Sequence, residues 1–299
     1  MTPAARRTGR KESMAKPKRP KSRHTSEALE PSQPAGPAVP SDARGHGGAV
    51  VLSRWQLDLF VKCPRCFWLL KRHGIKLPKS YPLALNLAMD ALLKTEFDAC
   101  RAAGRSHPVL LEAGVTARLF RDMEKLSAWR HNFRGLRWKQ PKTGHTLFGA
   151  IDDVLEFPDG SLAVLDFKAS GAAAATIYPD YQLQMDVYTF LLQRLGYRTA
   201  PKAFFAFFLA VKDGAFEGRL PFRPQVVEVT PQPERVPALF EQAIALAQAE
   251  QPPEPGPACD LCRWSGEAAS RLPVSARSRA VGAPPGTYVQ VEFEAPPSP

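Results

Sequence analysis

The chain has 299 residues, 30 of them proline, with 40 Lys and Arg against 29 Asp and Glu and a formal net charge of +11. The longest apolar run, 203–211, has nine residues, whereas a membrane-spanning helix needs roughly 20, so we expect no membrane span. The five cysteines are too few for a disulfide scaffold and favour a reducing, cytoplasmic compartment. The sequence contains neither a Walker nor a G-x-G-x-x-G phosphate-binding loop, which excludes an ATP motor or a dinucleotide fold of its own.

Charge and proline are concentrated at the two ends of the chain. The first 48 residues hold 10 Lys or Arg against 4 Asp or Glu, interspersed with proline, serine and glycine. Such composition predicts disordered tails over 1–48 and 269–299, and it leaves 49–268 as one α/β domain. The N-terminal tail is either a solvated segment or a basic arm that releases counterions on nucleic acid.

Hydrophobic periodicity and turn residues predict the elements of this domain. A capping box that begins at Ser53 opens a helix, which Pro64 interrupts. The segment 83–100 is a predicted helix with Leu85, Ala88, Leu92 and Phe97 on its buried side. Downstream we expect, in chain order, a helix over 116–129, an extended segment over 146–157, a turn over 158–161, a strand over 162–168, a helix over 180–195, strands over 202–211 and 225–229, and a helix over 237–249.

The predicted hairpin across the turn at 158–161 carries charged residues at unexpected places. Asp166 and Lys168 leave the same face of an otherwise apolar strand, because side chains alternate along an extended backbone. On the partner strand Asp152 and Asp153 follow one another, and the pairing register decides which of them shares that face. A register centred on Gly160 selects Asp152, whereas a slip by one residue selects Asp153.

Two carboxylates and a lysine on one face are the groups that metal-dependent phosphodiester hydrolysis uses. Carboxylate oxygens hold Mg²⁺ or Mn²⁺, and the ion polarises the phosphate and activates water. A lysine positions that water and offsets the developing charge. The D-x-K pattern by itself favours the simpler interpretation, a half-buried salt bridge in an ordinary hairpin.

Three motifs follow one another around this hairpin: Gly149-Ala-Ile-Asp152, Asp166-Phe-Lys168 and Gln184-Met-Asp-Val-Tyr188. In this order they resemble the PD-(D/E)XK nuclease superfamily, and most closely its RecB-like branch, which includes CRISPR-associated exonucleases. The resemblance covers about 53–265 and implies a restriction-endonuclease-like core, in which helices flank a central mixed β-sheet. It implies that Asp152 and Asp166 are metal ligands and that Lys168 is the catalytic lysine. Gln184 and Tyr188, one helical turn apart, would line the active site and contact DNA.

The RecB-like branch has a further metal-ligating histidine on an upstream helix, in the pattern G-x-x-x-H. Here Asn86-Leu-Ala-Met-Asp90 stands in its place, with Asp90 at the histidine position. A carboxylate is a suitable replacement ligand for Mg²⁺ or Mn²⁺. The alternative is that Asp90 lies on the solvated side of its helix.

Two C-x-x-C pairs flank the predicted core, Cys63-Pro-Arg-Cys66 and Cys259-Asp-Leu-Cys262. One such pair brings two thiolates onto one ion from a tight turn, and two pairs complete a four-sulfur site for Zn²⁺ or for a four-iron–four-sulfur cluster. Independent free thiols are the alternative. Cys100 is expected to be a small buried apolar residue.

The position of these pairs resembles that of the cysteines in the iron–sulfur RecB-like nucleases, which join the two ends of the core. This implies a 4Fe–4S cluster, with Zn²⁺ as the alternative. Those relatives have one upstream and three downstream cysteines, and this chain has Ala268 where the last would stand. We therefore expect Cys66 to supply the fourth ligand.

The sequence predicts a Mg²⁺- or Mn²⁺-dependent deoxyribonuclease, an exonuclease that acts on single strands or duplex ends in DNA repair, recombination or defence against foreign DNA. A helicase partner is expected by analogy, because RecB-like nucleases often work beside one. The rival hypotheses are a non-catalytic nucleic-acid-binding module that retains the fold and a zinc-stapled structural subunit.

Overall fold

A computed structural model of the chain describes residues 48–78, 84–215 and 217–272. The predicted tails therefore lie outside the described residues, except for 48 and 269–272. No helix within these ranges combines the length and the apolar character that crossing a bilayer requires.

Two β-sheets form the framework. The larger one has five strands in the order β2-β5-β6-β7-β8, and the smaller one has three in the order β1-β4-β3. Both are mixed, because the β6–β7 and β1–β4 pairs are parallel and the other pairs are antiparallel. The strands are β1 (Val51–Ser53), β2 (Arg118–Leu119), β3 (Leu136–Lys139), β4 (Thr146–Gly149), β5 (Asp153–Glu156), β6 (Leu162–Ser170), β7 (Ala203–Ala210) and β8 (Phe222–Val229).

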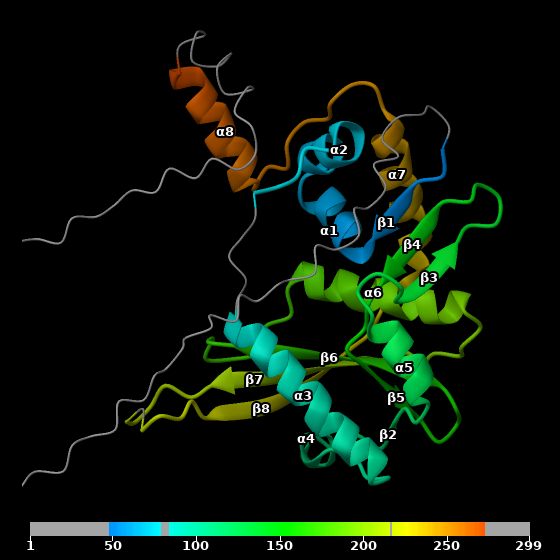
Figure 1. Ribbon diagram of the computed structural model, residues 1–299, viewed down its shortest axis with the longest axis vertical. Coiled ribbons are helices and arrows are strands. Elements are labelled where there is room, and N and C mark those ends of the chain that lie inside the picture. Colours follow the sequence, from blue (N-terminus) through cyan, green and yellow to red (C-terminus); the bar gives the residue numbers. More distant parts are fainter. Residues whose placement is uncertain (1–47, 79–83, 216, 273–299) are drawn as a thin grey trace, which may run out of the picture. The chain divides into compact units, whose positions relative to one another are not determined.

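Helices flank these sheets, as predicted for the fold (Figure 1). The crossover helix α6 lies between the sheets and contacts β3 and β4 on one side and β6 on the other, whereas α3 lies across the opposite face of the larger sheet. The helices are α1 (Arg54–Lys62), α2 (Pro64–His73), α3 (Ala84–Ala102), α4 (Pro108–Glu112), α5 (Met123–Arg130), α6 (Pro179–Arg194), a 3₁₀ turn (Pro233–Arg235), α7 (Val236–Gln248) and α8 (Asp260–Arg271).

The core consists of two apolar clusters, one on each face of the larger sheet. Strand β6 belongs to both, because Val164 faces the cluster that contains α6 and α7, whereas Leu165 and Phe167 face the cluster that contains α3. Asp166 has the same parity as Val164 and therefore leaves the sheet toward α6.

Local sequence signals account for several element boundaries. The side chain of Ser53 accepts a hydrogen bond from the Gln56 amide, and the Gln56 side chain accepts one from the Ser53 amide, so the predicted capping box is present. Pro64 occupies the first turn of α2, where its missing N–H has no cost. The expected turn at 158–161 and the elements expected from 162 to 249 are also present.

Two expectations about elements were wrong. The segment 116–129 is not one helix, because β2 pairs with β5 and the Asp122 side chain then caps α5. In α3, Leu85 and Leu92 are 60% and 64% exposed, because the helix buries Leu93 and Cys100 together with the expected Phe97. The segment 146–157 is extended as expected and forms two strands, β4 and β5, which belong to different sheets. Cys100 is buried as expected.

Candidate active site and cysteine cluster

The hairpin of β5 and β6 places Asp152 beside Asp166. The pairs Asp153–Leu165 and Val154–Val164 define its register, and one further step brings Asp152 opposite Asp166. Since side chains alternate, Asp153 points to the other face of the hairpin. The structure therefore brings Asp152, and not Asp153, to the carboxylate on β6.

Asp153 is instead the centre of a buried ion-pair network. Its carboxylate is fully buried and contacts the guanidinium groups of Arg101 and Arg130, the latter at 3.0 Å. Arg130 also donates from Nε to the carbonyl oxygen of Asp152 at 2.6 Å. This network holds the backbone at the start of β5 and so positions the Asp152 side chain. Sequence reasoning missed both arginines, because nothing local marks them as partners of this hairpin.

Asp166 lies at the centre of the candidate active site and is 1% exposed. Lys168 Nζ and Gln184 Nε2 both donate hydrogen bonds to its carboxylate. Burial and the neighbouring Asp152 raise the pKa of Asp166 to about 7, against the opposing effect of Lys168. Two carboxylates are thus held side by side in a place where a cation would relieve their repulsion.

Asp152 is held by a backbone amide and by Lys94. Its Oδ2 accepts from the Phe167 amide at 3.2 Å, and its Oδ1 lies 3.0 Å from Lys94 Nζ. Burial would raise the pKa of Asp152, but Lys94 and Lys168 outweigh burial and hold this pKa below its usual value. Asp152 is therefore a carboxylate anion that favours a positive partner.

Lys94 is a component that sequence reasoning missed. It stands one helical turn after Asp90 on α3, and its Nζ lies 2.8 Å from Asp90 Oδ2 as well as 3.0 Å from Asp152 Oδ1. An Asp–Lys pair at this spacing is common on solvated helix surfaces, so the sequence gives no sign that the lysine reaches the hairpin. Asp90 is linked to the site through Lys94, and the Asp90 side chain is 40% exposed.

The third motif closes the site from α6. Gln184 donates to Asp166 and accepts from Lys168 Nζ at 3.4 Å, so it connects the two. Tyr188 is 4% exposed, and a Cβ added at Gly149 would lie 2.6 Å from its ring. The glycine therefore permits a close approach between β4 and α6. Burial raises the pKa of Tyr188 to about 12, with Arg54 opposing the shift.

Asp152 and Asp166 fit a divalent cation by their chemistry, since they offer adjacent oxygen ligands. The three carboxylates Asp90, Asp152 and Asp166 do not converge on one point. Among the residues that the structure describes, the one group of three or more such side chains within ligand distance of one another is the cysteine cluster.

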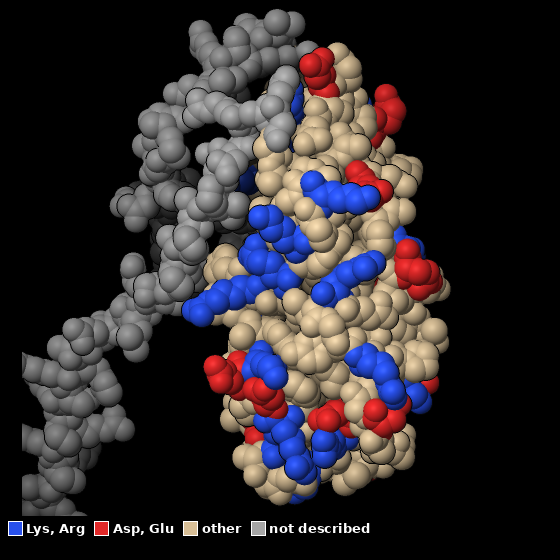
Figure 2. Space-filling model, turned by 90° about the vertical axis from the view of Figure 1, so that its right-hand side faces the viewer, with Lys and Arg blue, Asp and Glu red and all other residues tan. Residues whose placement is uncertain are grey.

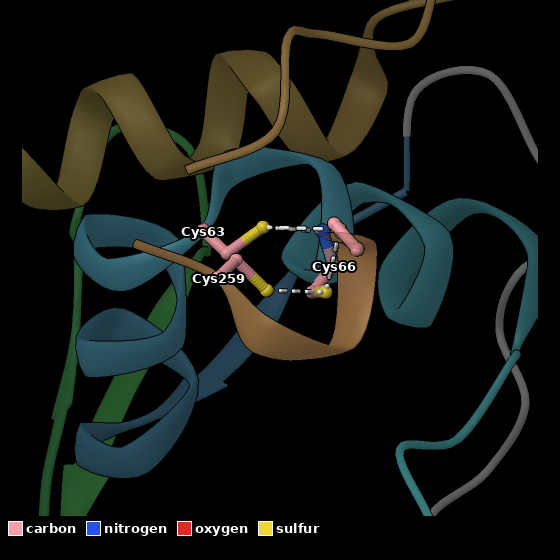
Figure 3. Close-up of side chains that lie close together, drawn as sticks. Cys63, Cys66 and Cys259 are labelled. Atoms are coloured by element: carbon pink, nitrogen blue, oxygen red, sulfur yellow. Dashed lines mark hydrogen bonds between the residues drawn. The ribbon is translucent and has the colours of Figure 1, made fainter. Parts of the chain in front are cut away.

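The four cysteines of the two C-x-x-C pairs meet in one cluster, and all four Sγ atoms lie within 4.8 Å of one another. Cys66 Sγ is 3.7 Å from Cys259 Sγ and 3.5 Å from Cys262 Sγ, and Cys63 Sγ is 3.6 Å from Cys262 Sγ. Figure 3 shows Cys63, Cys66 and Cys259 close together. This geometry matches the expected two-plus-two arrangement and opposes the interpretation as independent thiols.

Both pairs stand at helix N-termini. Cys63 is the N-cap of α2 and Cys259 is the N-cap of α8, so the positive ends of two helix dipoles face the sulfurs. The amides of Gly256 and Cys66 donate to Cys63 Sγ at 3.3 and 3.4 Å. Burial would raise the pKa of Cys63, but these amides outweigh burial and lower it to about 7.

Gly256 is required where the loop passes Cys63. A Cβ at this position would overlap the carbonyl oxygen of Lys62, so only glycine allows its amide to reach the Cys63 sulfur. The loop before α8 thereby donates an amide hydrogen bond that stabilises a thiolate at Cys63.

Comparison with known proteins adds the family. Among solved structures the chain is similar to SSO0001, with 14% identity, a TM-score of 0.34 and coverage of 77% of this chain and 89% of that one. It is also similar to LHK-Exo in complex with dAMP, with 10% identity, a TM-score of 0.32 and coverage of 79% and 96%. Comparison with curated proteins gives no match. Residues 51–266 match the sequence profile of the PD-(D/E)XK nuclease superfamily. Because this match spans the three motifs and both cysteine pairs, the chain belongs to the PD-(D/E)XK nuclease superfamily.

Proposed function

We propose that the protein is a divalent-metal-dependent deoxyribonuclease whose active site is formed by Asp152, Asp166 and Lys168. The observation that carries this proposal is the convergence of the three motifs. Asp152 stands beside Asp166, Lys168 contacts Asp166, and Gln184 on a separate helix bonds to both members of the D-x-K motif. An ordinary hairpin salt bridge accounts for Lys168 and Asp166 but does not account for Asp152 and Gln184.

Each side chain then has a distinct role. Mg²⁺ or Mn²⁺ bound by Asp152 and Asp166 would polarise the scissile phosphate and activate water. Lys168 orients the attacking water and offsets negative charge on the phosphate. Its ammonium is held in place by Gln184 and lies over the rings of Tyr181 and Phe205, 5.0 and 5.4 Å from their centroids.

Lys94 occupies the space between Asp90 and Asp152, where a cation would approach these carboxylates. We expect Lys94→Met to tighten Mn²⁺ binding by about three- to tenfold, because the metal then displaces no ammonium. Calorimetric titration of the intact protein measures this. Lys62→Met is the matched control, since Lys62 also bridges two carboxylates, Asp58 and Asp180, at 3.1 and 3.0 Å. If Lys94→Met bound Mn²⁺ as the wild type does, or more weakly, Lys94 would not occupy the position of the cation. Asp90 would then have no role as a metal ligand.

The mode of action rests on the resemblance to RecB-like nucleases. It supports an exonuclease that acts on single strands or duplex ends, in repair, recombination or defence against foreign DNA. The same resemblance supports a helicase as a partner of the protein. The exonuclease mode and the helicase partner are proposals by analogy.

For the cysteine cluster we propose a single Zn²⁺ ion. Zn–S bonds of about 2.3 Å place the sulfurs of a tetrahedral site about 3.8 Å apart. Three of the six sulfur pairs are 3.5–3.7 Å apart, and all six lie within 4.8 Å. A 4Fe–4S cluster binds each cysteine to a different iron, with the body of the cluster between them, so its cysteine sulfurs stand much farther apart. The 4Fe–4S cluster expected from the resemblance is the alternative.

The experiment for the nuclease compares the wild-type protein with Lys168→Ala on labelled single-stranded DNA in Mg²⁺ or Mn²⁺. We expect cleavage by the wild type and a loss of about 10²- to 10³-fold in the variant, because the variant lacks a positioned charge at the developing anion. Both proteins must have the same thermal stability and zinc content. Absent cleavage or equal rates in both would refute the proposal. Binding without cleavage, unchanged by Asp166→Ala, would favour the non-catalytic module.

A further inference from the structure

A basic run leads up to the candidate active site. The sequence has no acidic residue between Glu124 and Asp152. Within this run, four exposed cations lie on β3 or in the turns at its ends, and the exposed Arg194 at the end of α6 adds a fifth. We call these five residues the β3 basic strip: Arg134, Arg137, Lys139, Lys142 and Arg194.

The strip is not neutralised by neighbouring carboxylates. Among the described residues no Asp or Glu forms an ion pair with any of its five members, whereas Arg118, Arg198 and Lys202 elsewhere on the surface each pair with a carboxylate. Figure 2 shows the face at the right-hand side of Figure 1, and Lys and Arg side chains gather toward its middle with few acidic groups among them. Uncompensated charge of this kind attracts a polyanion.

Aromatic rings lie among these cations. The Arg137 guanidinium stands 4.7 Å over the ring of Phe148, its partner on β4. The Arg194 guanidinium stands 5.7 Å over Trp138, whose ring packs against Phe190 on the other face of β3. Phe133, in the turn before β3, is 48% exposed. Rings and stacked guanidinium planes are surfaces on which unpaired bases stack, whereas paired bases in a duplex are not free to do so.

The strip is continuous with the candidate active site. The first residue of β3, Leu136, pairs with Gly149, which stands three residues before Asp152. Arg130, four residues before Arg134, donates to the carbonyl oxygen of Asp152. A strand of nucleic acid that lies on the strip is therefore led toward the carboxylates.

We propose that the β3 basic strip binds single-stranded DNA and guides it to Asp152 and Asp166. Phosphates lie on the cations of the strip, and unpaired bases stack on Phe133 and on the Arg137 guanidinium that covers Phe148. The aromatic rings and the continuity with the carboxylates favour a single strand over an acidic protein partner. This inference deepens the proposed nuclease function, but binding by the strip does not require cleavage.

The test is a triple substitution, Arg137→Ser, Lys139→Ser and Lys142→Ser, in the full-length protein. Binding of fluorescent oligo(dT) is measured by anisotropy without added divalent cation, over a range of salt concentrations. We expect affinity to fall more than about tenfold and the slope of log K against log[salt] to fall by about 2, because three phosphate contacts are lost. The matched control is Arg118→Ser, Arg198→Ser and Lys202→Ser, which changes the net charge equally and should leave both quantities near the wild-type values.

Phe133→Ser separates stacking from charge. It should weaken oligo(dT) binding at least about fivefold and leave binding of a duplex of equal length unchanged. Equal losses in the two triple variants, or equal losses for single strand and duplex in Phe133→Ser, would overturn the proposal. The proposal would also be overturned if the strip variant lost binding to polyglutamate but kept binding to oligo(dT). That result would indicate an acidic protein partner.

Cleavage in Mg²⁺ or Mn²⁺ is measured separately, so that the two proposals can fail independently. If the wild type binds DNA through the strip and does not cleave it, the proposed nuclease activity is refuted and the proposed role of the strip stands. If the strip variant binds and cleaves DNA like the wild type, the proposed role of the strip is refuted and the proposed nuclease activity stands.

Discussion

Asp152→Asn is expected to abolish DNA cleavage with the fold intact. Asp153→Asn, at the neighbouring position, is expected to lower the stability of the fold and to leave the folded protein active. Asp152 is the partly accessible carboxylate beside Asp166, and its loss removes a proposed metal ligand. Several kcal/mol of transition-state stabilisation depend on such an ion, so we expect a fall in cleavage rate of at least about 10³-fold. Its contacts to Lys94 and to the Phe167 amide survive in part through the amide oxygen, so stability should change little.

Asp153→Asn removes the counter-charge of Arg101, whose side chain is 2% exposed. Breaking a buried ion pair from one side costs about 3–5 kcal/mol, and Asp98, which also contacts Arg101 and Arg130, should keep the loss near the lower figure. Urea unfolding measures the change, and cleavage at low temperature measures the activity of the folded fraction. If Asp153→Asn were inactive but stable and Asp152→Asn active, the hairpin register would be shifted by one residue and the site assignment would be wrong.

Removal of the metal proposed for the cysteine cluster is expected to release α8. This helix has no buried residue. Cys259 and Cys262, which stand against Cys63 and Cys66, and the partly buried Leu261 between them join it to the rest of the domain. Because metal binding at such a site is coupled to folding, we expect Cys66→Ala to lose the zinc and more than about 3 kcal/mol of stability, or about 6–12 °C in melting temperature. Trypsin should then cleave at Arg263 in α8.

Cys100→Ala is the matched control for this experiment. Cys100 is also a buried cysteine, but it lies in the other apolar cluster, so its variant should keep one zinc per chain and a protected α8. Metal analysis of the wild type distinguishes the occupants of the site, because zinc gives a colourless protein and an iron–sulfur cluster gives a brown one. A variant of Cys66 that retains its metal and a protected α8 would show that the cluster does not anchor the helix.

The motifs could be predicted from the sequence because each depends on local geometry. Asp166 and Lys168 share a face since they stand two apart on a strand, and Gln184 and Tyr188 share one since they stand a helical turn apart. A C-x-x-C pair converges within a single turn. These short-range relations do not depend on the rest of the fold, so the core, its three motifs and both cysteine pairs were recognisable before any tertiary contact was known.

Tertiary structure alone decided the relations between distant segments. The sequence left Asp152 and Asp153 open, because strand register depends on pairing and burial across the whole sheet. It gave no sign that Lys94 on α3 reaches Asp152, or that Arg101 and Arg130 neutralise Asp153, since long side chains find such partners only when elements pack. The separation of β4 from β5 into different sheets is of the same kind. Local patterns therefore determined which residues are candidates for the chemistry, and long-range packing decided which of them meet.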